Sequence, residues 1–158
     1  MAYPDVLAAA VTGTATNNNA LAGQVGEFVT ATVPIGSAIS LTTATSVNIT
    51  SISLTAGDWD VTGLLNFNLT GATGTLFQSG PSLTTGVLPT QPGGAGLGTD
   101  ALAILPIPVT GLTGDLTQIA GKVRVSIAAT TTVFLVAQAT FTVGTCTGFG
   151  TLRARRIR

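Results

Sequence analysis

The chain has 158 residues, which is enough for one domain with its own hydrophobic core, and it contains no histidine. The lack of histidine excludes His-based acid–base catalysis and metal ligation by imidazole. Apolar residues make up 45% of the chain and charged residues only 8%, yet no apolar run reaches the roughly 18 residues of a membrane-spanning helix. We therefore expect no membrane partner. We also expect a surface covered by Thr, Ser, Asn and Gly, with the remaining apolar surface in an oligomer interface.

The first part of the chain has the features of neither a signal peptide nor a core segment. Met1 to Asp5 carries an acid where a signal peptide has its basic region, so we expect synthesis in a host cytoplasm. Residues 1–24 are rich in Ala, Thr and Asn and contain the turn-forming run Asn17 to Asn19. We predict an extended arm over residues 1–24, followed by one β domain over residues 25–158.

Strand signals begin directly after this arm and are separated by turn residues. A first strand is predicted over Val25–Val33, where a following proline removes a ladder donor. A short strand is predicted over Ile39–Thr43. Val47–Leu54 alternates apolar and polar residues, and the alternation changes phase after Ile49. Such a change of phase indicates a β-bulge or a bend.

The strongest strand signal lies in Asp58–Leu69, where the residues follow a period of two. One face carries Trp59, Val61, Gly63, Leu65, Phe67 and Leu69, and the other carries Asp58, Asp60, Thr62, Asn66 and Asn68. On the apolar face we expect Trp59 to be a core anchor rather than a residue that stacks on a ligand. Asp58 and Asp60 fall on the other face, which we expect to be solvated. A cation site at these two acids is left open, because Ca²⁺ takes about six to eight oxygen ligands. A shorter strand is predicted to follow over Gly71–Phe77.

The second half of the chain begins with Ser79–Gly98, a segment rich in glycine and proline that we predict to be a long surface loop. Ala101–Val109 contains two prolines, which restrict it to a sheet edge or to an irregular extended segment. Further strands are predicted over Leu116–Ile127, over Thr131–Val143 and over Phe149–Ile157. The second of these is apolar on both faces and is expected to be a central strand. The pattern predicts an all-β fold, an antiparallel two-sheet sandwich of the jelly-roll type.

Charged residues are divided along the sequence, because every acid precedes Lys122 and every base follows Asp115. The division is compatible with chance among so few charges, or with a basic C-terminal edge that faces acids on a neighbouring subunit or another anionic partner. In the second interpretation Arg153, Arg155 and Arg156 are subunit contacts, since a guanidinium can hold a carboxylate with two hydrogen bonds. No nucleic-acid partner is expected, because phosphate binding needs a broader basic surface than one strand. The candidate acids on the neighbouring chain are Asp58, Asp60, Asp100 and Asp115.

Two further motifs are not expected to carry chemistry. Cys146 has no catalytic partner residue nearby in the sequence and is expected to be a buried, inert thiol. Gly93 to Gly96 is rich in glycine but lacks the Lys-Ser/Thr pair that completes a phosphate-binding loop. We therefore predict a protein that is not an enzyme, with no catalytic residue, no cofactor and no assigned metal ligand.

Four segments of the strand-rich part of the chain form a recognisable set. They are Gly26-Glu-Phe28, the more specific Ser51-Ile-Ser-Leu-Thr-Ala-Gly-Asp-Trp-Asp-Val-Thr-Gly63, Thr-Thr-Thr-Val-Phe-Leu-Val-Ala-Gln-Ala-Thr-Phe141, and Gly148-Phe-Gly-Thr-Leu-Arg-Ala-Arg-Arg-Ile157. On these segments the chain resembles, over about residues 25–158, the C-terminal β domain of tailed-bacteriophage fibre and particle-surface proteins. Such domains are similar in architecture to the trimeric jelly rolls of the C1q and tumour-necrosis-factor type, so the resemblance implies a homotrimer.

The resemblance departs from the family pattern at the N-terminus. A fibre protein places a long shaft or attachment region ahead of this domain, whereas here residues 1–24 precede it. This difference favours a decoration or cementing protein on the head surface of the virion, bound to the major capsid protein or another virion protein. The alternative is a fibre-tip module that binds a glycan or protein on the host cell surface.

Overall fold

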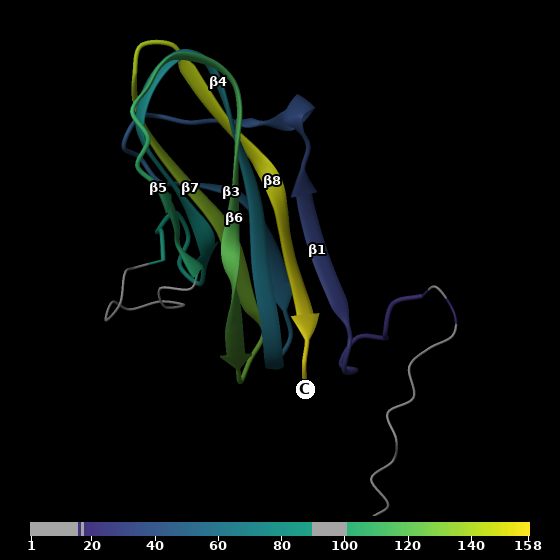
Figure 1. Ribbon diagram of the computed structural model, residues 1–158. Coiled ribbons are helices and arrows are strands. Elements are labelled where there is room, and N and C mark those ends of the chain that lie inside the picture. Colours follow the sequence, from purple (N-terminus) through teal and green to yellow (C-terminus); the bar gives the residue numbers. More distant parts are fainter. Residues whose placement is uncertain (1–15, 17, 90–100) are drawn as a thin grey trace, which may run out of the picture.

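The computed structural model describes residues 16, 18–89 and 101–158, which form a sandwich of β-strands (Figure 1). These residues contain the 3₁₀ turn η1 (Ile35–Ser37) and no α-helix. Nothing helical in the described ranges is long and apolar enough to cross a membrane. The strands are β1 (Phe28–Val33), β2 (Ile39–Ser40), β3 (Val47–Leu54), β4 (Gly57–Ser82), β5 (Ala103–Leu105), β6 (Val109–Ile127), β7 (Thr131–Thr142) and β8 (Thr145–Arg156).

All strand pairs are antiparallel, and they form two layers that share β4. The first layer has the order β1–β8–β4–β6, with β2 pairing with β8 beyond the end of β1. The second layer has the order β3–β7–β4–β5. The first part of β4 pairs with β8 and β6, and its last part pairs with β7 and β5. This strand order is that of a double-sheet jelly roll, so the predicted antiparallel sandwich is confirmed.

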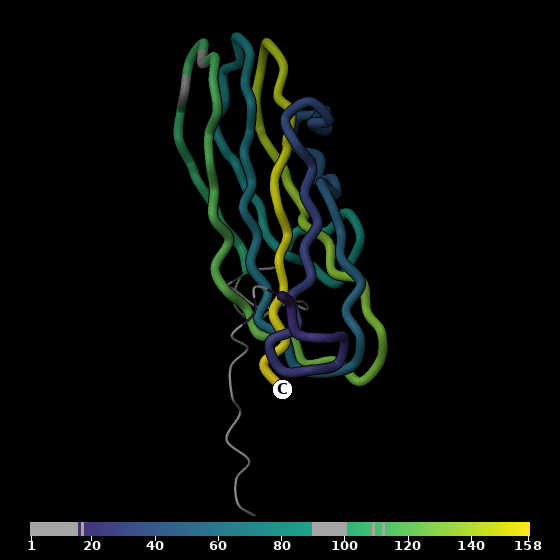
Figure 2. The backbone as a smooth tube through the Cα atoms, turned by 90° about the vertical axis from the view of Figure 1, so that its right-hand side faces the viewer, coloured from purple at the N-terminus to yellow at the C-terminus, as the bar shows by residue number. Residues whose placement is uncertain are grey.

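The two layers join at one corner, where two long segments of chain bend together. β7 and β8 follow one another along the same edge of β4, since β7 pairs with residues 73–82 and β8 with residues 59–70. Between these ladders β4 passes through Gly71 with φ +59°, and the β7–β8 junction passes through Gly144 with φ +66°. A Cβ on Gly144 would lie 2.4 Å from the Thr70 carbonyl oxygen, so the crossing requires glycine. Figure 2 shows the bent ends of these strands at the top of the molecule.

The core fills the space between the layers and follows the alternation of β4. Phe67 packs against Phe77 from the other half of the same strand, with the ring centroids 5.2 Å apart and the planes at 61°. β7 is a central strand, as predicted, because it lies between β3 and β4 and buries the adjacent residues Leu135 and Val136. The β4 residues predicted to face the core have no exposed side-chain surface: Trp59, Val61, Leu65, Phe67 and Leu69.

The structure corrects two boundaries predicted in the middle of the chain. The separate strand predicted over Gly71–Phe77 is wrong, because these residues continue β4 through its bend, and β4 is 26 residues long. The loop predicted from Ser79 begins later, since residues 79–82 pair with β7. Pro81 is tolerated there because β5 pairs with β4 only as far as Ser79, which leaves an unpaired edge beyond that residue. Residues 90–98 of the predicted loop lie outside the described residues.

At the N-terminal side, most of the predicted arm also lies outside the described residues, which include only residues 16 and 18–24 of it. The first strand begins at Phe28 rather than at the predicted Val25. Before it, the backbone forms a turn in which the N–H of Gln24 donates to the carbonyl oxygen of Leu21. The bulge predicted in β3 is confirmed by a register shift between Asn48 and Thr50.

Candidate functional site

A cluster of charged side chains lies at the end of the sandwich opposite the corner, around Arg156. Arg156 is only 5% exposed, although it is charged. Its Nε donates to Glu27 Oε2 at 2.9 Å, its Nη1 donates to the Ala56 carbonyl oxygen at 2.8 Å, and its guanidinium lies 4.3 Å from the Trp59 ring centroid. The Trp59 Nε1 donates to the Thr55 carbonyl oxygen at 3.0 Å. A buried guanidinium is tolerated here because an ion pair, a carbonyl and an aromatic face all contact it.

A second ion-paired group lies next to it around Asp58. Arg124 approaches Asp58 with two hydrogen bonds, Nε to Oδ1 at 2.7 Å and Nη2 to Oδ2 at 2.6 Å. Arg158 also contacts Asp58 Oδ2, at 2.7 Å from its Nε. The expectation that this face is solvated is therefore wrong for Asp58, which is 3% exposed because arginine side chains cover it. Asp60 is partly exposed and pairs with Lys122 at 2.9 Å.

These contacts leave few free carboxylate oxygens for a cation at the two aspartates. Both oxygens of Asp58 accept hydrogen bonds from arginine, and one oxygen of Asp60 accepts from lysine. The guanidinium and ammonium groups bound to these oxygens repel a divalent cation. Within the described ranges, no group of three or more Asp, Glu or Cys residues could hold a metal ion.

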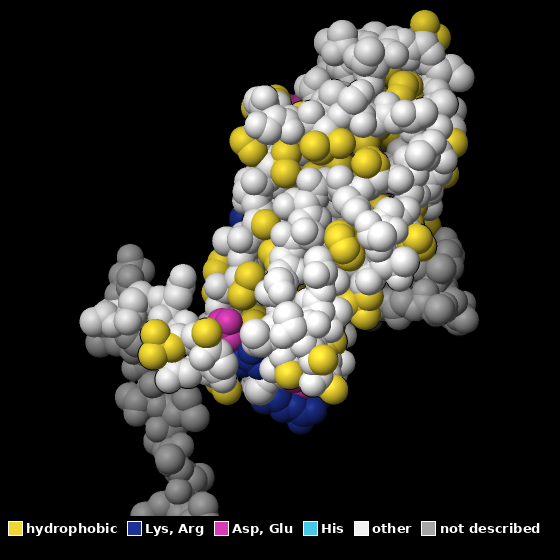
Figure 3. Space-filling model, turned by 180° about the vertical axis from the view of Figure 1, so that it is seen from behind, with side chains coloured by type: hydrophobic (Ala, Val, Ile, Leu, Met, Phe, Trp, Pro, Cys, Tyr) yellow, Lys and Arg dark blue, Asp and Glu magenta, His cyan; other side chains and the backbone are white. Residues whose placement is uncertain are grey.

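The division of charges along the sequence has an explanation within one chain. β4, which carries Asp58 and Asp60, lies between β6 and β8, which carry every base except Arg158. Seen from behind, the charged side chains gather mainly at this end and the rest of that face is largely uncharged (Figure 3). The subunit-contact role expected for Arg156 is corrected by its burial against Glu27 and Trp59 of its own chain. Of the expected partner acids, Asp58 and Asp60 are paired within the chain, and Asp100 lies outside the described residues.

The sequence did not single out Glu27 or Arg124, although both are central to this cluster. Glu27 Oε2 accepts hydrogen bonds from Arg156 and, at 2.7 Å, from the backbone N–H of Gly23. Glu27 therefore joins the last residues of the predicted arm to the end of β8. The sequence did carry a signal, because the acids of this cluster lie near the starts of strands and its arginines near the ends of strands. The strand register was needed to pair these charges.

The acidic groups of the cluster predict a loss of stability in acid. The Arg124 hydrogen bond lowers the pKa of Asp58, and the Gly23 N–H, followed by Arg156, lowers the pKa of Glu27. A carboxyl whose pKa is lower in the folded state stabilises the fold above its unfolded pKa of about 4, and this contribution is lost as the pH falls through the folded pKa. We expect the denaturant midpoint to be nearly constant between about pH 5 and 7 and to fall below about pH 4.

Substitution of the two acids tests this assignment. Asp58→Asn and Glu27→Gln should lower the midpoint at neutral pH and make its decline in acid shallower, because the group that titrates is gone. Asp60→Asn is the control, since this partly exposed acid pairs only with the exposed Lys122, and exposed ion pairs contribute little to stability. A decline that keeps its full slope in the Asp58→Asn and Glu27→Gln double variant would show that other groups cause it.

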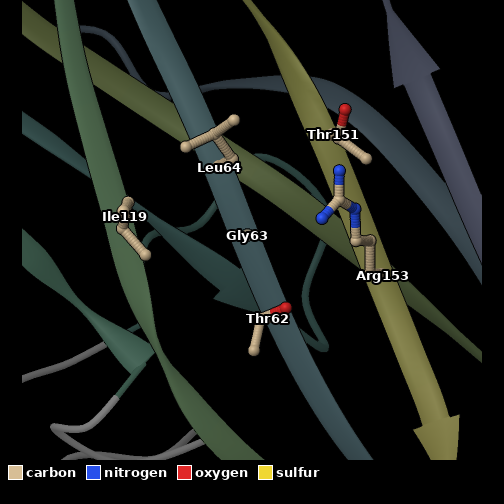
Figure 4. Close-up of a pocket in the computed structure, with 6 residues that line it drawn as sticks. All are labelled: Thr62, Gly63, Leu64, Ile119, Thr151 and Arg153. Carbon is tan, nitrogen blue, oxygen red and sulfur yellow. The ribbon is translucent and has the colours of Figure 1, made fainter.

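The outer face of the first layer is the second candidate site. It presents Arg153 and Arg155 of β8, which are both exposed and form no ion pair with a described residue. Alternation along β8 turns these two outward and Arg156 inward. A shallow pocket of about 170 Å³ lies in this face, and Figure 4 shows side chains from β4, β6 and β8 around it. Its lining residues are Thr62, Gly63, Leu64, Ile119, Thr151 and Arg153.

The environment of Cys146 is apolar, unlike that of the two candidate sites. This residue is 1% exposed in β8 and packs in the core. Burial raises the pKa of its thiol to about 11, so the reactive thiolate is scarce at neutral pH. The environment is that of the inert thiol expected from the sequence.

The strand order and the absence of α-helix from the described residues define a double-sheet jelly-roll protein. No family model and no curated protein matches the sequence. Among solved structures, the chain is similar to one in the structure of infectious bursal disease virus Gx strain, with a TM-score of 0.49 and 12% identity, over 92% of this chain and 37% of that chain. It is also similar to the VP2 subviral particle of infectious bursal disease virus, with a TM-score of 0.42 and 12% identity, over 83% and 33% of the two chains. The chain thus spans about a third of each, and its fold assignment rests on its own strand order.

Proposed function

We propose that this chain is a structural protein of a virus particle, and specifically a decoration or cementing protein on the head surface of a tailed bacteriophage. The observation that supports this most is that ionisable side chains form ion pairs within the chain. Glu27, Asp58 and Asp60 each pair with a base of the same chain, so these carboxylates are engaged in contacts within the sandwich. The jelly roll and the segments that resemble tailed-phage surface domains agree with a role in assembly rather than catalysis.

In this proposal the protein is a homotrimer attached to the outside of the shell. The partner is the major capsid protein or another virion protein, and the chain is made in the host cytoplasm before it joins the particle. Residues 1–24 would extend from the sandwich and contact the shell. Glu27 supports this separation into an arm and a sandwich, because its carboxylate contacts both the backbone N–H of Gly23 and Arg156 at the end of β8.

The attachment role can be tested by removing the arm. A variant lacking residues 1–20 should keep the unfolding midpoint of the full chain, since the deletion ends before Gly23, whose N–H donates to Glu27, and before the first strand. It should fail to bind shells purified without this protein, measured by co-sedimentation of the shells with labelled protein. The full chain is the positive control. The comparison of matched length is a full-length variant in which residues 7–11 are replaced by alternating Gly and Ser. Binding of the deletion variant at the full-chain level would refute attachment through the arm.

A second candidate function is supported by one specific feature, the exposed apolar side chains after β4. Leu83 is 38% exposed and Val87 is 47% exposed, in the segment that leads out of the second layer. Binding sites are often carried by such connections on a rigid scaffold. If the chain is a fibre-tip module, labelled protein should stain susceptible host cells, and Leu83→Ser with Val87→Ser should abolish the staining.

The two functions place the protein at different positions on the particle. Antibody labelling of intact particles, viewed by electron microscopy, should show the protein distributed over the head if it is a decoration protein. Label confined to the tail or to fibre ends would overturn that proposal in favour of the host-binding module.

A further inference from the structure

The charged side chains of the described residues that form no ion pair within the chain all lie on one face. Among the described residues, the charged side chains outside the ion pairs are Arg153, Arg155 and Asp115. Arg153 and Arg155 project from β8, opposite Thr62 and Asp60 of β4. Asp115 projects from β6 on the other side of β4 and lies nearer the corner. The outer face of the first layer is therefore basic along one part of β8 and acidic at one point of β6.

An apolar area separates these opposite charges. Leu64 of β4 lies opposite Ile119 of β6 in the sheet, and both line the pocket of about 170 Å³ (Figure 4). Ile119 is 73% exposed, although it lies in the middle of a regular strand. At the edge of the same face, Phe28 of β1 pairs with Arg155 and is 42% exposed. Exposed aliphatic, aromatic and arginine side chains together are typical of protein interfaces.

We propose that this face binds a second copy of the same chain, with Arg153 and Arg155 of one copy against Asp115 of the next. Asp115 Oδ1 accepts a hydrogen bond from Asn68 Nδ2 at 2.7 Å, and this bond holds the carboxylate in place. Both oxygens of this carboxylate can accept further hydrogen bonds, so a guanidinium can donate to them in a planar fork. The unpaired charges of one copy are thus opposite in sign to those that they would meet on the next copy. Ile119 and Leu64 provide the apolar centre of the contact.

The size of the face limits how much surface the contact can bury. The β4–β8 ladder runs from Trp59 to Thr70, and the layer is four strands wide. At about 3.3 Å per residue and about 4.8 Å per strand, the face measures roughly 40 Å by 19 Å. In a closed trimer each copy meets two neighbours, so this area, roughly 750 Å², is what one copy buries over both contacts together, close to the ~800 Å² per partner of a standard interface. The inference rests on the proposed function and supplies the subunit contact that the homotrimer requires.

Sedimentation equilibrium of the full chain tests the contact without any virus particle. We expect a mass near three times 15.7 kDa at micromolar concentration. Ile119→Glu should raise the dissociation constant by at least about tenfold, because it places a charge in the apolar centre. Ile104→Glu is the matched control, since Ile104 is 38% exposed in β5 of the other layer and should leave the mass unchanged.

A charge exchange tests the pairing itself. Arg153→Glu and Asp115→Arg should each weaken association, and the double variant should recover most of it, while circular dichroism confirms that all variants are folded. A monomeric full chain, or an oligomer that none of these substitutions weakens, overturns the proposed contact. A dimer weakened by them supports the contact and overturns the trimer. Failure to bind shells by an intact oligomer counts only against the proposed function.

Discussion

Replacing Trp59 with alanine is expected to lower the free energy of unfolding by about 3–5 kcal/mol, the range found when a buried large aromatic side chain is removed. Trp59 has no exposed surface and belongs to the core cluster of β4. The substitution also removes the aromatic face 4.3 Å from the Arg156 guanidinium, which would then be buried with fewer favourable contacts. Urea denaturation at one fixed protein concentration measures the effect, since association changes the apparent stability.

Trp59→Phe separates the contribution of the ring from that of the indole N–H. It keeps an aromatic face toward Arg156 and loses the hydrogen bond from Nε1 to the Thr55 carbonyl oxygen. The loss should be smaller, about 1–2 kcal/mol. If Trp59→Ala reduced the free energy of unfolding by less than about 1 kcal/mol, Trp59 could not be an anchor of this core.

Gly144→Ala is expected to be at least as damaging, through the backbone rather than the core. The added Cβ would lie 2.4 Å from the Thr70 carbonyl oxygen, 2.6 Å from the Gly71 carbonyl carbon and 2.7 Å from the Ala72 nitrogen. These are backbone atoms, so no change of side-chain rotamer relieves the overlap. The left-handed conformation adds about 1–2 kcal/mol for a residue with a Cβ. We expect a total loss above about 4 kcal/mol, seen as a large drop in the denaturant midpoint or in soluble yield.

Gly71→Ala is the matched control at the same corner. Gly71 also has a left-handed backbone, with φ +59°, but a Cβ added there would meet nothing within 4 Å. Only the conformational contribution remains, so the expected loss is about 1–2 kcal/mol. Equal losses from the two substitutions would contradict the close crossing of β4 and the β7–β8 junction.

Much of the fold could be predicted because the strands have an unusually regular pattern. The alternation from Trp59 to Leu69 identifies both the strand and its buried face, since successive side chains of a strand point to opposite sides. The two-sided apolar segment of β7 identified a central strand for the same reason. The phase change after Ile49 located the bulge of β3.

The continuity of β4 could not be predicted, because local signals at its bend indicate a turn. Gly71 and Pro81 both argue for an interruption when only neighbouring residues are considered. In the structure the backbone remains extended because β7 supplies ladder partners up to Ser82, and the bend at Gly71 is matched by the one at Gly144. That match depends on residues more than seventy positions apart in the sequence.

The sequence by itself determined the all-β class, the buried face of the strongest strand and the burial of Trp59, because these follow from side-chain period and residue type. It also showed the division between acids and bases. Only the tertiary structure decided what that division means. Arg156 and Arg155 are neighbours in sequence, but the alternation of β8 buries the first against Glu27 and leaves the second on the surface. Pairing depends on strand register, and the register is set by the antiparallel ladders of β4 with β6 and β8.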